Sequence, residues 1–141
     1  DLDKFEISFI DIGCGKGKPS IIFSKVIKNF KNFGIDIDDQ FRNKFYNNLK
    51  KFSKENYFIN TNVLEFDFNK ANSEVMIFFF MNTLNEVSML KLINIIKKVN
   101  NKKKFFVYHN PENSNVLNNF NLIYSKKDGW HKLWGIKIYR I

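Results

Sequence analysis

The sequence predicts an α/β fold, in which a mostly parallel sheet lies between layers of helices and ends in an antiparallel hairpin. Apolar runs alternate with segments of helical spacing along most of the chain. A glycine-rich loop follows the first apolar run and leads into a helix. Near the end of the chain, Lys127-Asp128-Gly129 is a turn signal that joins two strand-like segments directly.

The first two strands and the helix between them can be placed from the apolar spacing. We expect the first strand over Ile7–Ile12 and a helix that begins at Pro19, because proline suits the first turn of a helix. The second strand is expected over Phe33–Ile37. The side of the helix that packs on the sheet is predicted to carry Ile22, Val26, Ile27 and Phe30.

The middle of the chain continues the same alternation. Asp39–Phe52 is predicted to be a helix, with apolar side chains three and four residues apart at Phe41, Phe45, Leu49 and Phe52. A short third strand is expected over Tyr57–Ile59. Val75–Phe80 is an uninterrupted apolar run, which is typical of a central parallel strand covered on both faces.

The last third of the chain changes from helix-linked strands to a hairpin. A helix is predicted from Glu86 to Val99, followed by a fifth strand over Lys104–Tyr108. Phe120–Lys126 and Leu133–Tyr139 are predicted to pair as the antiparallel hairpin. No repeat, linker or low-complexity tract divides the sequence, so we expect residues 1–141 to form one domain.

Composition predicts a soluble protein of the cytoplasm. Hydrophobic residues make up 44% of the chain, and 17 of its residues are Phe, so a core can form without disulfides. Cys14 is the only cysteine, and no run of eighteen apolar residues or secretory leader is present. The sequence opens at Asp1 rather than Met and reaches its first strand at once, so we expect that an N-terminal segment is missing.

A formal net charge of +9 invites comparison with nucleic-acid-binding proteins, because basic surfaces neutralise phosphates. Only two of the 23 basic residues are arginine. The lysines lie at helix ends and turns, where they usually form a solvated surface. A nucleic-acid partner is therefore not favoured. The lysines concerned are Lys28, Lys31, Lys50, Lys51, Lys97, Lys98 and Lys102–Lys104.

The glycine loop is the most specific motif in the sequence. A dinucleotide-binding G-x-G-x-x-G loop would need glycine where Lys18 stands. A phosphate-binding P-loop would need glycine at Ile12 and a hydroxyl at Pro19. The pattern that remains, D-x-G-x-G-x-G over Asp11–Gly17, resembles the first motif of the class I S-adenosylmethionine (SAM) dependent methyltransferases.

This resemblance implies a Rossmann-like three-layer sandwich with SAM as the cofactor, and it covers nearly the whole chain. In open α/β sheets, ligands bind at the carboxyl ends of the strands, where the strand order reverses. The reversal is expected between the first and fourth strands. The loop residues that the resemblance assigns to cofactor binding are Asp11, Gly13, Cys14, Gly15 and Gly17. Cys14 is expected to pack rather than to act as a nucleophile.

A second motif supports the resemblance. Gly34-Ile35-Asp36 matches the G-[VI]-[DE] segment of the family, and Asp36 stands 19 residues after Gly17. An acid at this position accepts hydrogen bonds from the ribose hydroxyls. Asp36 and the adjoining Ile37 are therefore assigned to the cofactor, whereas Asp38 is expected to cap the next helix.

Asn62 and Val63 follow the third strand and are the candidates for the adenine site. Asn62 stands where the family usually has an acid that accepts from the adenine amino group, and an amide oxygen can accept the same bond. Asparagine in a loop also commonly forms a turn, so both roles stay open. Val63 would contribute its backbone N–H.

The candidates for catalysis follow the fourth and fifth strands. Asn82 matches a position where many relatives place Asn or Asp near the reacting methyl group. The enzymes that methylate the adenine amino group continue with Pro-Pro, whereas this chain has Asn82-Thr83-Leu84-Asn85, which argues against a base amine as acceptor. A helix cap is the alternative role for Asn82 or Asn85.

Tyr108, His109, Asn110 and the following Pro111 resemble the Y-x-N-P motif of a group of small bacterial methyltransferases of largely unassigned substrate. His109 is the general-base candidate, because its ordinary pKa lies near neutrality, and a merely structural role is the alternative. His131 lies in the hairpin and has less claim. Two histidines and one cysteine offer no metal site.

The function that these motifs predict is transfer of a methyl group from SAM to an N or O nucleophile. A non-catalytic SAM-binding or degenerate Rossmann module is the alternative, because Asn62 replaces the usual acid. An aminopropyl transferase is disfavoured, because such enzymes need an acidic pocket for a polyamine and this chain is basic. The acceptor is not identified, and a protein side chain, a glycan or a small molecule are the classes considered.

Overall fold

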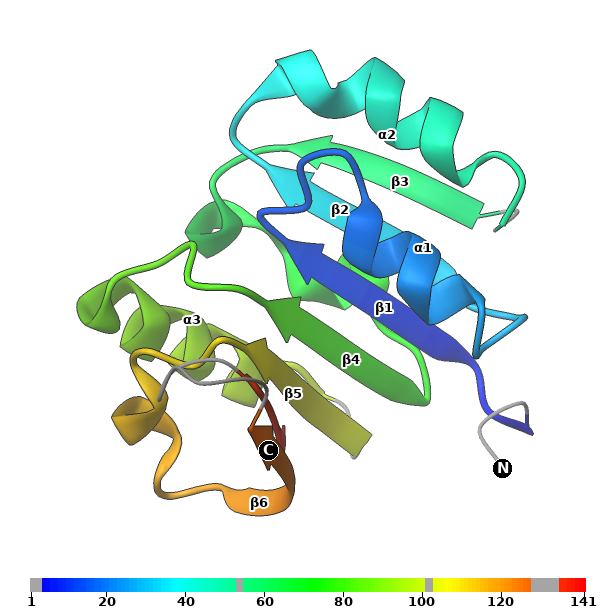
Figure 1. The fold of residues 1–141 in the computed structure, drawn as a ribbon. Coiled ribbons are helices and arrows are strands. Elements are labelled where there is room, and N and C mark those ends of the chain that lie inside the picture. Colours follow the sequence, from blue (N-terminus) through cyan, green and yellow to red (C-terminus); the bar gives the residue numbers. More distant parts are fainter. Residues whose placement is uncertain (1–3, 53–54, 101–102, 128–134) are drawn as a thin grey trace.

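The computed structural model describes residues 4–52, 55–100, 103–127 and 135–141, in which a single sheet runs through the molecule (Figure 1). The strands are β1 (Ile7–Ile12), β2 (Lys31–Asp36), β3 (Glu55–Asn60), β4 (Val75–Phe80), β5 (Lys103–His109), β6 (Asn121–Lys127) and β7 (Gly135–Arg140). The helices are α1 (Lys18–Ser24), α2 (Arg42–Leu49) and α3 (Glu86–Lys98). Short 3-10 turns are η2 (Asp39–Phe41), η3 (Val63–Glu65), η4 (Phe68–Ala71) and η5 (Ser114–Leu117).

The predicted fold class is confirmed by the strand order β3-β2-β1-β4-β5-β7-β6. β1 to β5 are parallel, and β7 is inserted antiparallel between β5 and β6. The order reverses between β1 and β4, where Ile12 pairs with Phe80 on one side and with Ile35 on the other. The ends of β1, β2 and β4 therefore meet at one edge of the sheet.

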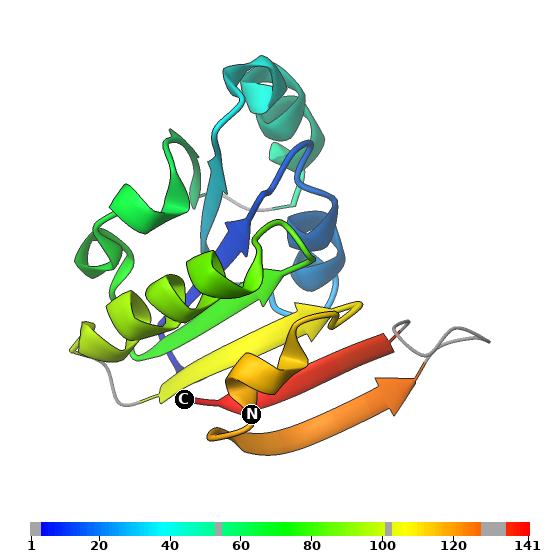
Figure 2. The same cartoon turned by 90° about the vertical axis from the view of Figure 1, so that its left-hand side faces the viewer.

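The helices cover both faces of the sheet, which gives the three predicted layers (Figure 2). α1 and α2 lie on one face with η2, and α3 lies on the other with η3, η4 and η5 (Figures 1 and 2). Within the described residues, none of these helices has the length and apolar character needed to cross a bilayer.

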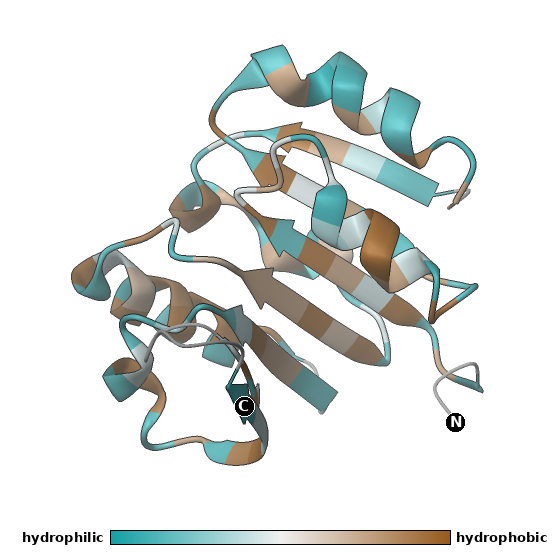
Figure 3. Ribbon diagram, in the orientation of Figure 1, coloured by the Kyte–Doolittle hydropathy of each residue, from teal (hydrophilic) through white to brown (hydrophobic). Residues whose placement is uncertain are grey.

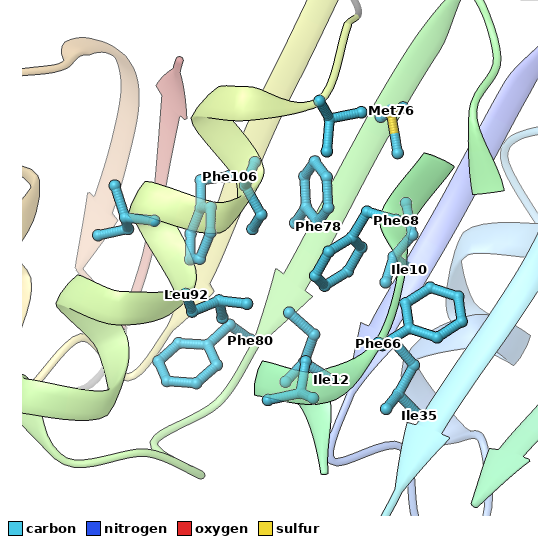
Figure 4. Packing of buried hydrophobic residues seen from close by; sticks show 14 of the residues in the cluster. Ile10, Ile12, Ile35, Phe66, Phe68, Met76, Phe78, Phe80, Leu92 and Phe106 are labelled. Carbon is cyan, nitrogen blue, oxygen red and sulfur yellow. The ribbon is translucent and has the colours of Figure 1, made fainter. Parts of the chain in front are cut away.

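The largest part of the core lies between the sheet and α3 (Figure 4). Phe78 of β4 stacks on Phe106 of β5, with ring centroids 6.2 Å apart, and contacts Phe68 edge-on. β4 is hydrophobic along its whole length (Figure 3), and its residues are buried except for the half-buried Phe79. The boundaries of this strand match the prediction, because both of its faces are covered and every position is apolar.

The prediction of which side of the first helix packs on the sheet is partly wrong. α1 ends at Ser24, and Ile22 and Val26 point to solvent with 57% and 74% of their surface exposed. The residues of α1 that are buried are Ser20 and Ser24. Small side chains let the helix backbone approach the sheet closely, so apolar spacing alone gave the wrong face. Ile27 is buried beyond the end of α1, as is Phe30.

The second helix is shorter than predicted. η2 and α2 together span Asp39–Leu49, and Phe52 lies beyond them with 42% of its surface exposed. Phe45 and Leu49 are fully buried and pack with Phe58 of β3. A Cβ atom on Gly34 of β2 would lie 2.4 Å from the Phe45 ring, so glycine there lets α2 settle on the sheet.

Several strand boundaries also differ from the prediction, and β3 and β5 extend beyond the predicted Tyr57–Ile59 and Lys104–Tyr108 at both ends. β2 begins at Lys31 and ends at Asp36, so Ile37 lies outside the strand. β6 and β7 pair antiparallel as expected, with β6 exposed at every residue. Asp128 and Gly129 of the predicted turn, and Leu133 at the predicted start of the last strand, lie outside the described residues.

The end of α3 is closed by a buried lysine. Lys104 donates from Nζ to the carbonyl oxygens of Ile96 and Val99 at 3.0 Å and to that of Lys97 at 3.3 Å. These are carbonyl groups that a helix leaves unpaired at its C-terminus. Burial lowers the pKa of the Lys104 ammonium group. The lysine thus fixes the end of α3 against the start of β5.

We expect Lys104→Met to lower the free energy of unfolding by about 2 kcal/mol, because buried carbonyl groups lose a charged donor. Lys98→Met is the control, because Lys98 is exposed in the last turn of the same helix. Urea unfolding of both variants measures the effect. Equal losses for the two variants would show that Lys104 does not close the helix.

Candidate active site

The predicted site residues lie along the carboxyl edge of the sheet, at the ends of β1 to β5. The chain leaves β1 at Gly13, beside the ends of β2 and β4, its partners in the sheet. Each loop at this edge contacts the loop of the neighbouring strand. The contacts between these loops define the site.

The glycine loop is held by positive backbone φ angles. Gly13, Gly15 and Gly17 have φ of 70°, 48° and 77°, a region that side chains disfavour. The N–H groups of Gly13 and Cys14 donate to the carbonyl of Ile35, at 2.9 and 3.2 Å. A Cβ on Gly13 would lie 2.4 Å from Cγ2 of Thr83, so glycine lets the loop after β4 close on the loop after β1.

Asp36 fastens this loop to the end of β2. Its Oδ2 accepts from the N–H of Gly15 at 2.8 Å, and its Oδ1 accepts from the N–H of Asp38 at 3.0 Å. A carboxylate has about four lone-pair positions, so each oxygen keeps capacity for a further donor. Ile37, next in the chain, is 78% exposed at the same edge. Asp38 caps η2 by accepting from the N–H of Gln40 at 3.0 Å, as predicted.

The loop after β3 is tied to the loop after β2. Asn60 donates from Nδ2 to the carbonyls of Asp36 and Ile37, at 3.2 and 3.0 Å. Asn62 accepts the N–H of Leu64 on Oδ1 at 3.0 Å and so caps η3. The turn-forming role of Asn62 is therefore present in the structure. Val63 starts η3, where backbone N–H groups have no partner within the turn, and its side chain is buried.

Asp11 lies below the glycine loop rather than on its surface. It is 1% exposed, and its Oδ2 accepts from the hydroxyl of Ser20 at 3.1 Å. The same hydroxyl lies 2.9 Å from Oδ1 of Asn32, whose Nδ2 donates to Asn56 at 3.0 Å. Burial raises the pKa of Asp11 to about 7. Asp11 and Ser20 join the end of β1 to the first turn of α1 across the glycine loop.

Cys14 is buried inside the loop. Its side chain is 3% exposed and packs with Phe45 and Leu49 of α2. Burial raises the pKa of the Cys14 thiol far above its ordinary value, and Asp11 and Asp36 add to the rise. A protonated, buried thiol is a packing group and not a nucleophile.

A buried tyrosine orients Asn82. The hydroxyl of Tyr108 donates to Oδ1 of Asn82 at 2.9 Å and accepts the N–H of Asn113 at 3.1 Å. The N–H of Glu112 also points to Oδ1 of Asn82, at 3.4 Å. Since both groups approach the oxygen of the amide, the Asn82 NH₂ group is left for other partners. Asn82 has φ of 44°, which is uncommon for a residue other than glycine.

His109 and Asn110 follow Tyr108 in the chain but contact other groups than Asn82. Nδ1 of His109 lies 3.1 Å from the sulfur of Met81, and its ring stacks on Phe79 at 6.3 Å. Asn110, with φ of 51°, accepts the N–H of Gly135 on Oδ1 at 3.2 Å. Asn110 therefore connects the end of β5 to the start of β7. His131 lies outside the described residues.

The structure adds residues that sequence reasoning missed. Ser20, Asn32 and Asn60 hold the site together, although none of them carries a motif. Ser20 lies in the first turn of the helix after the loop, which is a signal that could have been used. Asn32 is a polar residue inside an apolar strand and could likewise have been noticed. In the described part of the chain, no cluster of three His, Cys, Asp or Glu side chains could hold a metal ion.

The sequence matches no protein-family model and no curated protein. Solved structures nevertheless resemble this one. The N-methyltransferase NodS from Bradyrhizobium japonicum WM9 has a TM-score of 0.71 at 13% identity, over 99% of this chain and 88% of that chain. A SAM dependent methyltransferase from Aquifex aeolicus has a TM-score of 0.68 at 16% identity, over 94% and 80% of the chains. An rRNA methylase from Streptococcus thermophilus has a TM-score of 0.64 at 14% identity, over 96% and 85%. The chain has a class I methyltransferase fold.

The raised pKa of Asp11 predicts a pH dependence of stability. Burial holds the pKa of Asp11 at about 7 in the folded protein, whereas the ordinary pKa of an aspartate is 3.8. The free energy of unfolding therefore falls as the pH rises between these values. Asp11→Asn removes this dependence. Its stability relative to the parent chain should increase by roughly 2 kcal/mol between about pH 5 and about pH 8.

Urea unfolding of both proteins at several pH values measures the difference. Asp39→Asn is the control, because Asp39 is exposed and paired with Arg42 at the surface. A constant difference between the Asp11→Asn variant and the parent chain across this pH range would contradict the assignment.

Proposed function

We propose that the chain binds SAM at the carboxyl edge and transfers its methyl group to an N or O nucleophile. The observation that carries the proposal is the hydrogen bond of 2.8 Å between Gly15 and Asp36. It brings the D-x-G-x-G-x-G loop and the acid of the second strand together beside the point where the strand order reverses. NodS, which shares the fold, has also been solved in complex with S-adenosylhomocysteine.

The adenosine part of the cofactor would lie over the end of β2. Asp36 would use its remaining lone pairs for the ribose hydroxyls. Ile37, whose side chain is 78% exposed, would cover the adenine ring. The N–H of Val63 would bond the ring edge. Asn62 would use the second lone pair of Oδ1 for the adenine amino group.

The methionine part would lie over the glycine loop at Gly15, where a Cβ atom would meet no heavy atom within 4 Å and the backbone is open to a ligand. Asp11 and Cys14, both buried, would act on the cofactor only by holding this loop in place. The loop of the first motif would thus form the surface on which the methionine part lies, and Asp11 would hold that loop in place from below.

SAM supplies an activated methyl group, so the protein mainly has to position the acceptor and exclude water. Asn82 would present its NH₂ group to the acceptor, and Tyr108 would hold Asn82 in that orientation. His109 would take a proton where the acceptor must lose one. Asn110 would fix the end of β5 against β7. The acceptor is a protein side chain, a glycan or a small molecule, and the single buried cysteine suits a cytoplasmic protein.

A second candidate function is a non-catalytic SAM-binding module. The observation in its favour is that Oδ1 of Asn62 already caps η3, which weakens its claim to the adenine group. Formation of S-adenosylhomocysteine with any acceptor would exclude this candidate. Absence of turnover across an acceptor screen, with SAM bound, would favour it.

The test of the proposal is calorimetric titration of the purified chain with SAM and S-adenosylhomocysteine, with NADH and ATP as controls. We expect binding of the two sulfur-containing ligands alone, with dissociation constants in the micromolar range. Binding of NADH or ATP with equal affinity would contradict the assignment of the cofactor.

Asp36→Ala should weaken SAM binding by roughly 10- to 100-fold, because hydrogen bonds to a carboxylate contribute about 1.5–3 kcal/mol. Asp38→Ala is the matched control, because Asp38 caps η2 and is not assigned to the ribose. Since Asp36 also holds Gly15, thermal unfolding and the Asp36→Asn variant are measured alongside. Equal affinity of the Asp36→Ala variant and the parent chain would refute the ribose role.

Ile37→Ser should weaken SAM binding about tenfold, because the adenine ring would lose an apolar surface. The melting temperature should not change, since Ile37 is 78% exposed. Val26→Ser is the control, because Val26 is 74% exposed beyond the end of α1 at the opposite edge. Loss of affinity in both variants, or in neither, would contradict the proposed position of the adenine ring.

A further inference from the structure

The lysine excess of this chain gathers at the amino edge of the sheet, opposite the glycine loop. Parallel strands begin at this edge, and the helices between them end there. In Figure 1 the tails of β1, β3, β4 and β5 lie on the right, together with the ends of α1 and α2. Lysines that are far apart in the sequence therefore come together, as Lys28 and Lys50 do in the lining of one cavity.

The carboxyl edge has the opposite character. Acidic side chains outnumber the lysines Lys16 and Lys18 there, and they are Asp36, Asp38, Asp39, Glu65, Asp67 and Glu112. Attraction of lysines to the negative ends of helix dipoles explains part of this separation. Helix dipoles do not explain why lysines from separate elements line one cavity.

An open cavity of about 510 Å³ lies at the amino edge. It is formed by the starts of β1, β2 and β3 and by the chain after α2. Its basic side chains are Lys28, Lys31, Lys50 and Lys51, and its acidic ones are Glu6 and Glu55. Lys31 forms an ion pair with Glu6 at 2.5 Å.

The other three lysines of the cavity are exposed. Within the described residues, Lys28, Lys50 and Lys51 have no carboxylate within salt-bridge distance. Their charges are therefore available to an anionic ligand. Such a ligand would gain from several ammonium groups around one cavity and would release counterions on binding.

The cavity also has an aromatic lining. Phe30 is buried in its wall, Phe5 is half-buried, and Phe52 is 42% exposed next to Lys50 and Lys51. An exposed phenylalanine beside two lysines is poorly suited to an acidic peptide but offers a flat surface for a nucleobase. Aromatic faces beside a basic groove are the feature by which proteins hold single-stranded nucleic acid without reading its sequence.

The sequence alone does not favour a nucleic-acid partner, but the fold gathers three of those lysines around one cavity beside Phe52. We propose that this cavity binds single-stranded nucleic acid, with phosphates on Lys28, Lys50 and Lys51 and a base on Phe52. The site is independent of methyl transfer, because the strands separate it from the glycine loop by about 20 Å. It is a docking surface, which holds a strand away from the carboxyl edge.

The test is fluorescence anisotropy with a labelled single-stranded RNA of mixed sequence and about 12 nucleotides, a length within the range of known single-strand sites. Lys28→Gln, Lys50→Gln and Lys51→Gln are combined in one variant. The matched control combines Lys91→Gln, Lys126→Gln and Lys127→Gln, which remove the same charge from exposed positions on α3 and β6. Phe52→Ala is measured separately, and circular dichroism verifies that each variant is folded.

We expect the cavity variant to bind RNA at least tenfold more weakly than the parent chain, and the control variant to stay within about twofold. Between about 50 and about 200 mM salt, the cavity variant should also show a smaller loss of affinity than the parent chain. Phe52→Ala should weaken binding by about fivefold or more, because base stacking is lost.

Equal losses in the two lysine variants would overturn the proposal, because net charge alone would then explain binding. Unchanged affinity of the Phe52→Ala variant, with a poly-glutamate peptide bound as tightly as RNA, would point to an acidic protein partner and would also overturn it. So would the absence of RNA binding by the parent chain at low salt.

Discussion

The burial of β1 is the constraint on which the rest of the structure depends. All residues of Ile7–Ile12 are buried, and the strand is paired on both sides, by β2 and β4. The chain can therefore leave β1 only by a turn at the carboxyl edge. Glycines allow that turn and let the loops after β2 and β4 close on it. The position of the site follows from this strand.

Each loop at the carboxyl edge is held in place by contacts with its neighbour. Asn60 joins the loops after β3 and β2, and Asp36 joins β2 to the glycine loop. Thr83 packs on Gly13, and Tyr108 bonds Asn82 across β4 and β5. A ligand at this edge meets groups whose positions are already fixed, so binding needs little further ordering of the protein.

The sequence predicted the elements that an uninterrupted pattern defines. Val75–Phe80 was placed correctly because every position is apolar. The inner face of α1 was wrong, because spacing does not reveal where a helix ends or that serines face the sheet. The Tyr108–Asn82 bond joins residues 26 positions apart, and no local pattern predicts such a contact. The motifs thus located the site from the sequence. The contacts that hold its residues in place could be identified only from the fold.

The central claim is that Asp36 and the glycine loop together form the cofactor site. A crystal structure of the chain grown with S-adenosylhomocysteine tests it most directly. We expect the ribose hydroxyls on Asp36, the adenine ring against Ile37 and the homocysteine over Gly13–Gly17. A ligand bound at another edge of the sheet, or at this edge without contact to Asp36, would contradict the claim.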